Sequence, residues 1–147
     1  MDDLSYPTIA DLEQLVAENP GDAQSLVRLA NGYWLEGMGP ELVGEIAQRA
    51  KTLDPSSRGA WHMWALAESN PRDRTERWRQ VSAQFPSDDL ARANLADNAA
   101  ALAGAEHDYM ALDLAIETYE QLLAGATEPM QREALEKALE ILRKWKF

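Results

Sequence analysis

Prolines with capping residues beside them interrupt this sequence at nearly regular intervals, and the stretches between them have the pattern of helices. Pro20 and Pro55 lie 35 residues apart, Pro86 follows after 31 residues, and Pro129 after a further 43. Proline stops one helix and is tolerated in the first turn of the next, and a nearby Asp, Ser or Asn can cap that next helix. A period of about 34 residues is typical of helical hairpins that bury their apolar faces by stacking.

The sequence predicts an all-α fold, because no run of alternating Val, Ile, Thr or aromatic residues favours a strand. The last helix is clearly amphipathic, since Leu135, Leu139 and Leu142 fall on one face. About eight helices are predicted near Thr8–Glu18, Ala23–Glu36, Glu41–Thr52, Arg58–Ser69, Arg72–Gln84, Asp89–Ala103, Tyr109–Ala124 and Met130–Trp145.

The residues of these hairpins resemble the tetratricopeptide repeat family. The first-repeat residues at family positions are Leu26, Leu29, Ala30, Tyr33 and Gly37, followed by Ala47, Ala50, Leu53 and Pro55. Those of the later repeats are Trp61, Trp64 and Ala65, then Leu95, Ala96 and the stretch 115–123. Three positions depart from the pattern: an extra residue near Gly39, Glu68 where the family has Tyr, and Arg92 where it has a large apolar side chain.

The resemblance implies one domain over 1–147, a right-handed α-solenoid of stacked antiparallel helix pairs. Helix 8–18 would be an N-terminal cap, the segments 22–55, 56–86 and 87–129 three repeats, and helix 130–145 a C-terminal cap. The long third interval is expected to hold an enlarged turn at 103–108.

In this family the first helix of each repeat lines an inner groove that holds a peptide, so the resemblance also implies a binding site. Its residues here would be Gln24, Val27, Asn31, Trp34, Leu35, His62, Met63, Leu66, Leu90, Asn94 and Asp97. Apolar pockets would take the side chains of an extended or helical peptide, and the Asn amides would bond its backbone. The alternatives remain open that the apolar members are ordinary core and the polar members a solvated face. A grip on a terminal carboxylate is not expected, because no Lys lies among these positions.

Tryptophan is abundant, with Trp34, Trp61, Trp64, Trp78 and Trp145 in one short chain. We expect Trp61 and Trp64 to pack between helices and Trp34 to be an exposed contact residue. Trp145 and Phe147 at the end of the chain are a frayed tail, a docking patch or the seam of a homodimer.

The charge of the chain restricts its partners. The formal net charge is −11, and both nucleic acids and anionic membrane surfaces require basic side chains, so neither is an expected partner. A basic or apolar protein or peptide suits this field better. The run Arg72, Arg74, Arg77 and Arg79 contrasts with 105–128, which has six acidic residues and no Lys or Arg, and copies could pair through these faces.

No motif of an enzyme, a metal site or a cofactor site is present in the sequence. There is no Cys, no Gly-rich phosphate loop and no nucleophile elbow, and His107 between two acidic neighbours lacks a second His at helical spacing. The acidic start Met1–Pro7 is no signal peptide, and no apolar stretch is long enough to enter a membrane. We therefore predict a cytoplasmic, non-catalytic scaffold or assembly factor without cofactors, or a periplasmic one if a longer anchored protein contains this chain.

Overall fold

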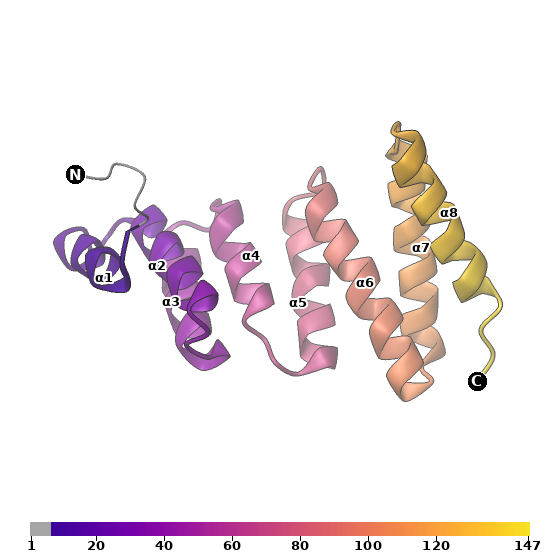
Figure 1. Cartoon of the computed structure of the whole chain (residues 1–147), viewed down its shortest axis with the longest axis horizontal. Helices are drawn as coiled ribbons and strands as arrows, with labels where there is room; N and C mark the ends of the chain where they lie inside the picture. Colours follow the sequence, from indigo (N-terminus) through magenta and orange to yellow (C-terminus); the bar gives the residue numbers. More distant parts are fainter. Residues whose placement is uncertain (1–6) are drawn as a thin grey trace. The chain divides into compact units, whose positions relative to one another are not determined.

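The structure is a computed structural model that describes residues 7–147, so residues 1–6 of the acidic start lie outside it (Figure 1). The described residues contain no strand, which confirms the all-α prediction. They form α1 (Ile9–Glu18), α2 (Ala23–Leu35), α3 (Pro40–Leu53), α4 (Arg58–Leu66), α5 (Pro71–Gln84), α6 (Asp89–Glu106), α7 (Tyr109–Gly125) and α8 (Pro129–Arg143).

Local capping explains most of the helix boundaries. The side chains of Asp22, Ser57, Asn70, Asp88 and Asp108 each accept a hydrogen bond from a backbone N–H in the first turn of the following helix. These bonds satisfy amides that have no partner within the helix. The predicted boundaries therefore agree with the structure to within about three residues.

Two boundaries differ for identifiable reasons. Helix α4 ends at Leu66 instead of continuing to Ser69, because Asn70 precedes Pro71 and must leave the helical region to cap α5. Helix α6 continues to Glu106, where His107 ends it in the left-handed region at φ 52°. The prediction of an enlarged turn at 103–108 is wrong, since the surplus residues lengthen α6 and α7 to 18 and 17 residues.

The chain consists of two compact units, Met1–Ser69 and Asn70–Phe147. The border falls between α4 and α5, inside the segment 56–86 that the sequence predicts as one repeat. Within each unit, antiparallel helices pack side by side, as α2 and α3 do in the first unit and α6 and α7 in the second. The division of the chain into one domain of three repeats with caps stays a prediction.

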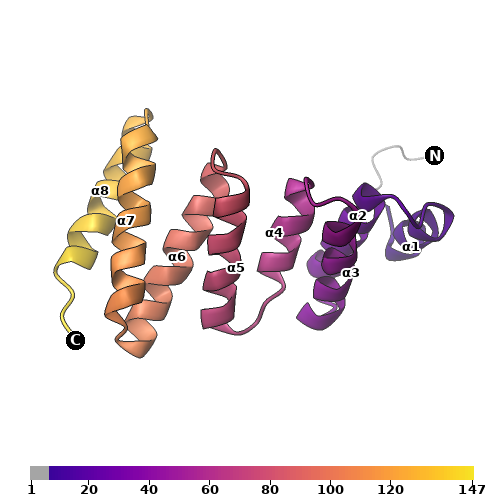
Figure 2. The ribbon, with the colours of Figure 1, turned by 180° about the vertical axis from the view of Figure 1, so that it is seen from behind.

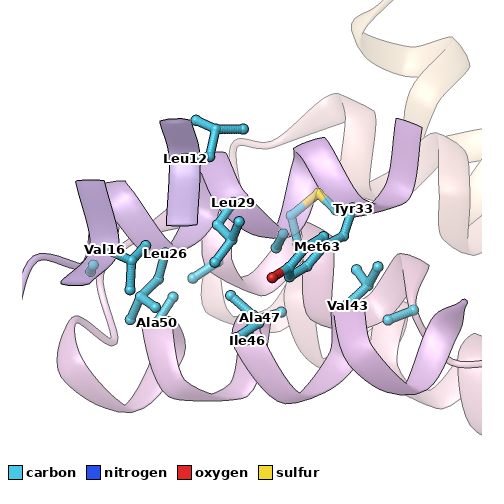
Figure 3. Packing of buried hydrophobic residues seen from close by; sticks show 14 residues of the cluster. Leu12, Val16, Leu26, Leu29, Tyr33, Val43, Ile46, Ala47, Ala50 and Met63 are labelled. Carbon is cyan, nitrogen blue, oxygen red and sulfur yellow. The ribbon is translucent and has the colours of Figure 1, made fainter. Parts of the chain in front are cut away.

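The N-terminal unit has a core of branched and aromatic side chains between α1, α2, α3 and α4 (Figure 3). Leu26 and Val43 are completely buried there, and Tyr33 is 6% exposed. The Tyr33 hydroxyl donates a 2.6 Å hydrogen bond to Glu13 on α1. Gly32 lets α1 approach, because a Cβ at that position would lie 2.7 Å from Leu12 Cδ1. Helix α1 is thus held against α2 by close packing and by one charge-assisted hydrogen bond.

In the C-terminal unit, the interface between α6 and α7 is built around small residues. Figure 2 shows α5, α6, α7 and α8 of this unit from behind. Ala99, Ala103 and Ala115 are completely buried where α6 meets α7, and the absence of larger side chains lets the two backbones approach closely. Trp78 of α5 is 1% exposed and is the largest fully buried side chain of the described residues.

Among the eight described helices, none is both long enough and apolar enough to cross a lipid bilayer. Helix α6 reaches 18 residues but mixes charged and amide side chains with its alanines.

Candidate protein-binding surfaces

Helix α2 presents four of the predicted groove residues at the surface of the N-terminal unit. Gln24, Asn31 and Leu35 follow one another at seven and four residues, so they lie on one face of the helix, and Trp34 is beside them. Leu35 is 75% exposed and Trp34 is 41% exposed. Two large apolar side chains next to an amide give this face the composition of a protein contact surface.

A hollow of about 350 Å³ lies between α1 and α2 beside this face. We call it the α1–α2 hollow, and its lining consists of Pro7, Ile9, Leu12, Arg28, Asn31, Gly32, Leu35 and Glu36. The sequence predicted Asn31 and Leu35 but missed the α1 side, because helix 8–18 was interpreted as a cap. The apolar Ile9 at the start of that helix was the available signal.

Helix α4 does not supply the open surface that the sequence predicted for it. Met63 is 6% exposed and belongs to the core of the N-terminal unit, and Leu66 and Val27 pack against that core. Val27 reaches across to α4, where a Cβ on Gly59 would lie 3.0 Å from its Cγ1. His62 is half-buried. The assignment of Met63 to a groove is therefore corrected to helix–helix packing, as α4 buries its apolar face against α2 and α3. Val27 and Leu66 are partly buried, and their place in a groove stays a prediction.

Trp61 and Trp64 form a small aromatic cluster between α3 and α4. Their ring centroids are 5.7 Å apart in an edge-to-face arrangement, and the Trp61 indole N–H donates to Pro55 O at 2.8 Å. Lys51 Nζ lies 4.4 Å from one ring centroid and 4.1 Å from the other. A lysine over two aromatic rings is a cation–π contact, which fastens the end of α3 to α4.

Helix α6 presents the remaining predicted residues on one face of the C-terminal unit. Leu90, Asn94 and Asp97 follow at four and three residues, and Leu90 is 55% exposed. The Asn94 side-chain amide donates to Leu90 O at 2.9 Å, an arrangement that fixes the amide along the helix. Asp97 accepts a 2.5 Å hydrogen bond from the hydroxyl of Tyr119 on α7. Burial and this carboxylate together raise the pKa of Tyr119 well above its usual range.

One turn beyond Asp97, an apolar hollow of about 280 Å³ opens between α6, α7 and α8. We call it the α6–α8 hollow, and it is lined by Ala100, Ala101, Tyr119, Ala138, Ile141, Leu142 and Trp145. From the sequence, Trp145 was expected at a contact and Leu142 on the apolar face of the last helix, while Tyr119 lay within the repeat-like stretch 115–123. The strong amphipathic pattern of the last helix was a signal for α8, but its pairing with α6 depends on the tertiary fold.

The two residues predicted for self-association lie against their own unit. Phe147 stacks on His107 with the ring centroids 5.0 Å apart, and Tyr109 and Trp145 lie 5.0 Å and 6.0 Å from it. The Phe147 backbone N–H donates to the Tyr109 hydroxyl at 2.7 Å. Phe147 keeps 40% of its surface exposed. The end of the chain is therefore fastened to the α6–α7 turn, and a role of Trp145 and Phe147 in a dimer seam stays a prediction.

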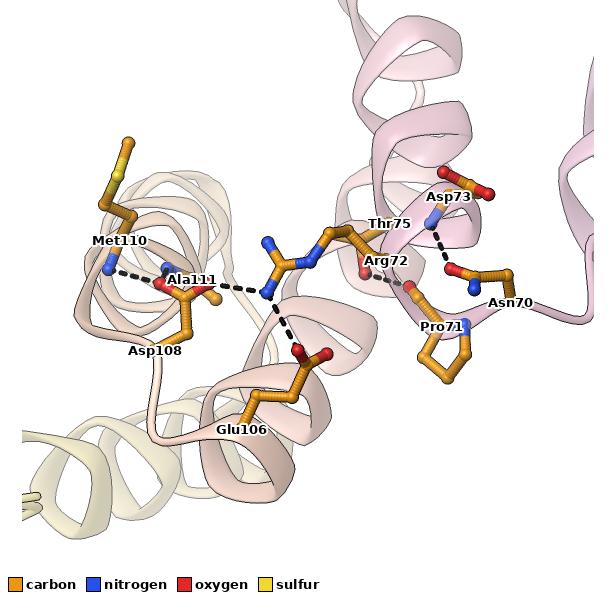
Figure 4. A network of polar contacts seen from close by, with 9 residues as sticks. All are labelled: Asn70, Pro71, Arg72, Asp73, Thr75, Glu106, Asp108, Met110 and Ala111. Atoms are coloured by element: carbon orange, nitrogen blue, oxygen red, sulfur yellow. Dashed lines mark hydrogen bonds and ion pairs between the residues drawn. The ribbon is translucent and has the colours of Figure 1, made fainter.

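Part of the basic run on α5 pairs with the acidic segment inside the C-terminal unit (Figure 4). Arg72 lies 3.2 Å from Glu106 and 2.9 Å from Asp108. The guanidinium lowers the pKa of Asp108, which also accepts hydrogen bonds from the Ala111 and Met110 amides. Arg72 therefore fastens α5 to the α6–α7 turn, and a pairing of these faces between copies would have to compete with this contact.

Among residues 7–147, no three His, Asp or Glu side chains gather as metal ligands would.

No family model and no curated protein matches this sequence. Solved structures do match its fold. One of them, "Crystal structure of MamA protein", superposes on this chain with a TM-score of 0.64 at 18% sequence identity, and the match covers 79% of this chain and 61% of that chain. Another, titled crystal structure of MamA, has a TM-score of 0.60 and 14% identity, covering 92% of this chain and 85% of that one.

Identities of this size establish a shared fold and nothing finer. The chain spans about 61% of the length of the first of these proteins. The matched structures are helical-repeat proteins, in agreement with the stacked helix pairs seen within each unit. The chain thus has an all-α helical-repeat fold, while the narrower likeness to tetratricopeptide repeats remains a resemblance of residues.

Proposed function

We propose that this chain is a non-catalytic protein–protein interaction module that binds peptide or protein segments, through the exposed face of α2 in the N-terminal unit and, separately, through the exposed face of α6 in the C-terminal unit. The observation that carries the proposal is the α6 face, where Leu90, Asn94 and Asp97 lead to the apolar α6–α8 hollow. A row of polar groups beside an apolar hollow is what an extended or helical peptide requires, since it brings both side chains and backbone groups. The helical-repeat fold supports a scaffold role of this kind.

The chemistry of the two faces indicates the class of ligand. Gln24 and Asn31 on α2 and Asn94 on α6 are neutral, and Asp97 adds a negative charge. Because the whole chain carries a formal charge of −11, it attracts basic segments and repels nucleic acid. The expected ligand is therefore a protein segment with apolar side chains and neutral or basic flanks.

The test begins by capturing partners from the native source with the wild-type chain and with a Trp34→Ala/Asn94→Ala variant. Overlapping peptides that cover the sequence of each captured protein are then synthesised. Their affinities for both purified chains are measured by calorimetry. We expect one segment to bind the wild type and to lose roughly tenfold or more in affinity for the variant, as truncated contact residues commonly do. Circular dichroism of both chains shows that the variant is folded.

A matched control replaces one leucine and one polar residue on the other helices of the pairs, Leu53→Ala/Gln121→Ala. Leu53 ends α3 and is 48% exposed, and Gln121 is exposed on α7. This variant is expected to bind like the wild type. Equal loss in both variants, or no loss in either, would exclude the α2 and α6 faces as the binding site.

A further inference from the structure

Helix α8 carries an unusual ridge on its exposed side. Its residues are Met130, Ala134, Lys137, Ile141 and Lys144, which we call the α8 ridge. They follow at four, three, four and three residues, the spacing of a seam between two packed helices. All five are exposed, Met130 by 84% and Ile141 by 52%, while Leu139 and Leu142 on another side of α8 are buried. The α8 ridge thus offers apolar side chains and two lysines, of which Lys144 lies 3.4 Å from Glu140 on the same helix.

The α1–α2 hollow has the complementary form. It is a furrow between two adjacent helices, and ridges of a third helix pack into such furrows. Ile9 and Leu12 provide an apolar floor, and Leu35, which is 75% exposed, extends this floor to the rim. Its volume of about 350 Å³ leaves room for side chains and not for a whole helix. A row of protruding side chains such as Met130 and Ile141 suits it.

The surroundings of the α1–α2 hollow and of the α8 ridge also differ in charge. Residues 1–27 contain six acidic side chains and no Lys or Arg, whereas residues 129–147, which form α8 and the tail after it, contain five basic side chains and three acidic ones. On α1, Asp11, Glu13 and Glu18 are all exposed. The rim of the hollow itself is balanced, with Arg28 against Glu36. The surrounding acidic surface therefore attracts the lysines of the α8 ridge, most strongly at low ionic strength.

We propose that the α8 ridge of one copy of this chain docks in the α1–α2 hollow of a second copy. Because the ridge and the hollow are different surfaces, each copy keeps one unused hollow or one unused ridge after pairing. Such a head-to-tail contact adds further copies until a ring closes or an open chain forms. The contact goes beyond the proposed peptide binding, although it shares Leu35 with the α2 face and Ile141 with the α6–α8 hollow. Trp34 and Asn94 take no part in it, so the Trp34→Ala/Asn94→Ala variant tests peptide binding and not this contact.

The decisive test uses two variants that each remove one half of the contact. Leu35→Lys puts a positive charge at the hollow, where it repels Lys137 and Lys144. Met130→Gln/Ile141→Gln removes the apolar part of the α8 ridge and leaves the α1–α2 hollow intact. Sedimentation velocity and light scattering of the wild type up to about 1 mM, the weak end of specific association, should show assembly that grows with concentration. Each variant alone should be monomeric where the wild type is assembled, with the apparent dissociation constant raised roughly tenfold or more.

The equimolar mixture of the two variants gives the sharpest result. One variant retains its ridge and the other its hollow, so they can form a single contact, and we expect one-to-one dimers and nothing larger. The control Leu53→Lys, at an exposed leucine that ends α3 as Leu35 ends α2, should assemble like the wild type. A charge variant, Lys137→Glu/Lys144→Glu, and added salt should each weaken wild-type assembly.

Four outcomes would overturn the proposal: a wild type that stays monomeric at every concentration, assembly of either variant at wild-type strength, a mixture that stays monomeric, or equal loss in Leu53→Lys. Circular dichroism of every variant accompanies these measurements. If one of the apolar variants does not fold, Lys137→Glu/Lys144→Glu takes its place, because both lysines are exposed and their replacement leaves the core unchanged.

Discussion

The N-terminal unit fills the space between its helices with large side chains, whereas the C-terminal unit brings α6 and α7 together on small ones. In the N-terminal core, eight of the fourteen buried residues are larger than alanine, among them Leu26, Tyr33 and Val43. In the cluster of α6, α7 and α8, four of the seven buried residues are alanines and the other three are leucines. The N-terminal core should therefore be sensitive to loss of volume, and the α6–α7 interface to gain of volume at its alanines. Trp78 of α5 lies outside that cluster and makes the rest of the C-terminal unit sensitive to loss of volume as well.

The units also differ in how they fasten their outer elements. In the N-terminal unit, close packing at Gly32 and the bond from Tyr33 to Glu13 hold α1. In the C-terminal unit, the exposed pairs of Arg72 with Glu106 and Asp108 and the aromatic contacts of Phe147 gather at the α6–α7 turn. Buried contacts resist salt and exposed ion pairs do not, so the two units should respond differently to solution conditions.

The largest expected effect is that of Trp78→Ala in the C-terminal unit. Removing this fully buried indole should lower the free energy of unfolding by about 3–5 kcal/mol, and Leu26→Ala should cost the N-terminal unit about 2–5 kcal/mol. Hydrogen exchange followed by mass spectrometry locates each loss. Protection should fall in α5–α8 for the first variant and in α1–α4 for the second, and a uniform loss in either would show that the two cores unfold together.

Enlarging a buried alanine should destabilise the C-terminal unit by adding volume, whereas the previous variants act by removing it. Ala115→Leu places extra volume where α7 meets α6 and should destabilise the C-terminal unit by about 1–3 kcal/mol, because the site is completely buried. Urea unfolding followed by circular dichroism measures the change. Ala124→Leu, on the exposed surface of the same helix, is the control and should unfold like the wild type. Tolerance of Ala115→Leu would mean that α6 and α7 can separate without cost.

Tyr33→Phe should weaken the attachment of α1 by about 1 kcal/mol at neutral pH, the usual value of such a hydrogen bond. The bond to Glu13 and burial raise the pKa of Tyr33 from 10.0 to about 12. Because the folded state favours the protonated hydroxyl, this stabilisation is complete below pH 10 and is lost as the pH rises toward 12. Absorbance titration of tyrosinate in the wild type and in Tyr33→Phe checks the value. If the difference between the two titrations, which isolates Tyr33, is centred near pH 10, the hydrogen bond to Glu13 is absent.

Replacing each of two partly buried helix glycines by alanine should change the stability by different amounts. A Cβ at Gly44 would lie 3.5 Å from the Ala67 Cβ, an ordinary contact, so Gly44→Ala should stabilise α3 by about 0.5–1 kcal/mol through helix propensity. A Cβ at Gly104 would lie 3.2 Å from the Trp145 ring, which must shift, so Gly104→Ala should gain less or nothing. Thermal unfolding of both variants compares the two. An equal gain would show that Trp145 is not held against α6.

The smallest effect is expected for Arg72→Ala. Both ion pairs of Arg72 are exposed, so their contribution to stability is small and disappears as salt is added. The measurement is the difference in unfolding midpoint between this variant and the wild type at low and at high ionic strength. Arg79→Ala, which removes an exposed pair within a single helix, is the control. A difference that persists at high salt would mean that Arg72 acts through packing and not through charge.

The helices could be predicted from the sequence because their determinants are local. Proline and capping residues such as Asp22 and Asn70 act on amides within three residues of them, so the eight helices of residues 7–147 and most of their boundaries follow from local sequence. The end of α6 was missed because His107 ends it in the left-handed region, and a non-glycine residue is uncommon there even though histidine is among the more frequent ones. The exposed faces of α2 and α6 were predicted for the same local reason, since residues at helical spacing share a face.

Contacts between distant segments decided the rest. Met63 was expected at a surface and lies in the core, because the packing of α4 on α2 and α3 determines which side of α4 is covered. The α6–α8 hollow combines Ala101 with Ile141, 40 residues later, and the Tyr119 hydroxyl finds Asp97 22 residues earlier. Secondary structure follows from interactions among near neighbours, which a sequence displays directly. The hollows and the core depend on how helix faces distribute buried area among several neighbours, and that distribution exists only once the chain has folded.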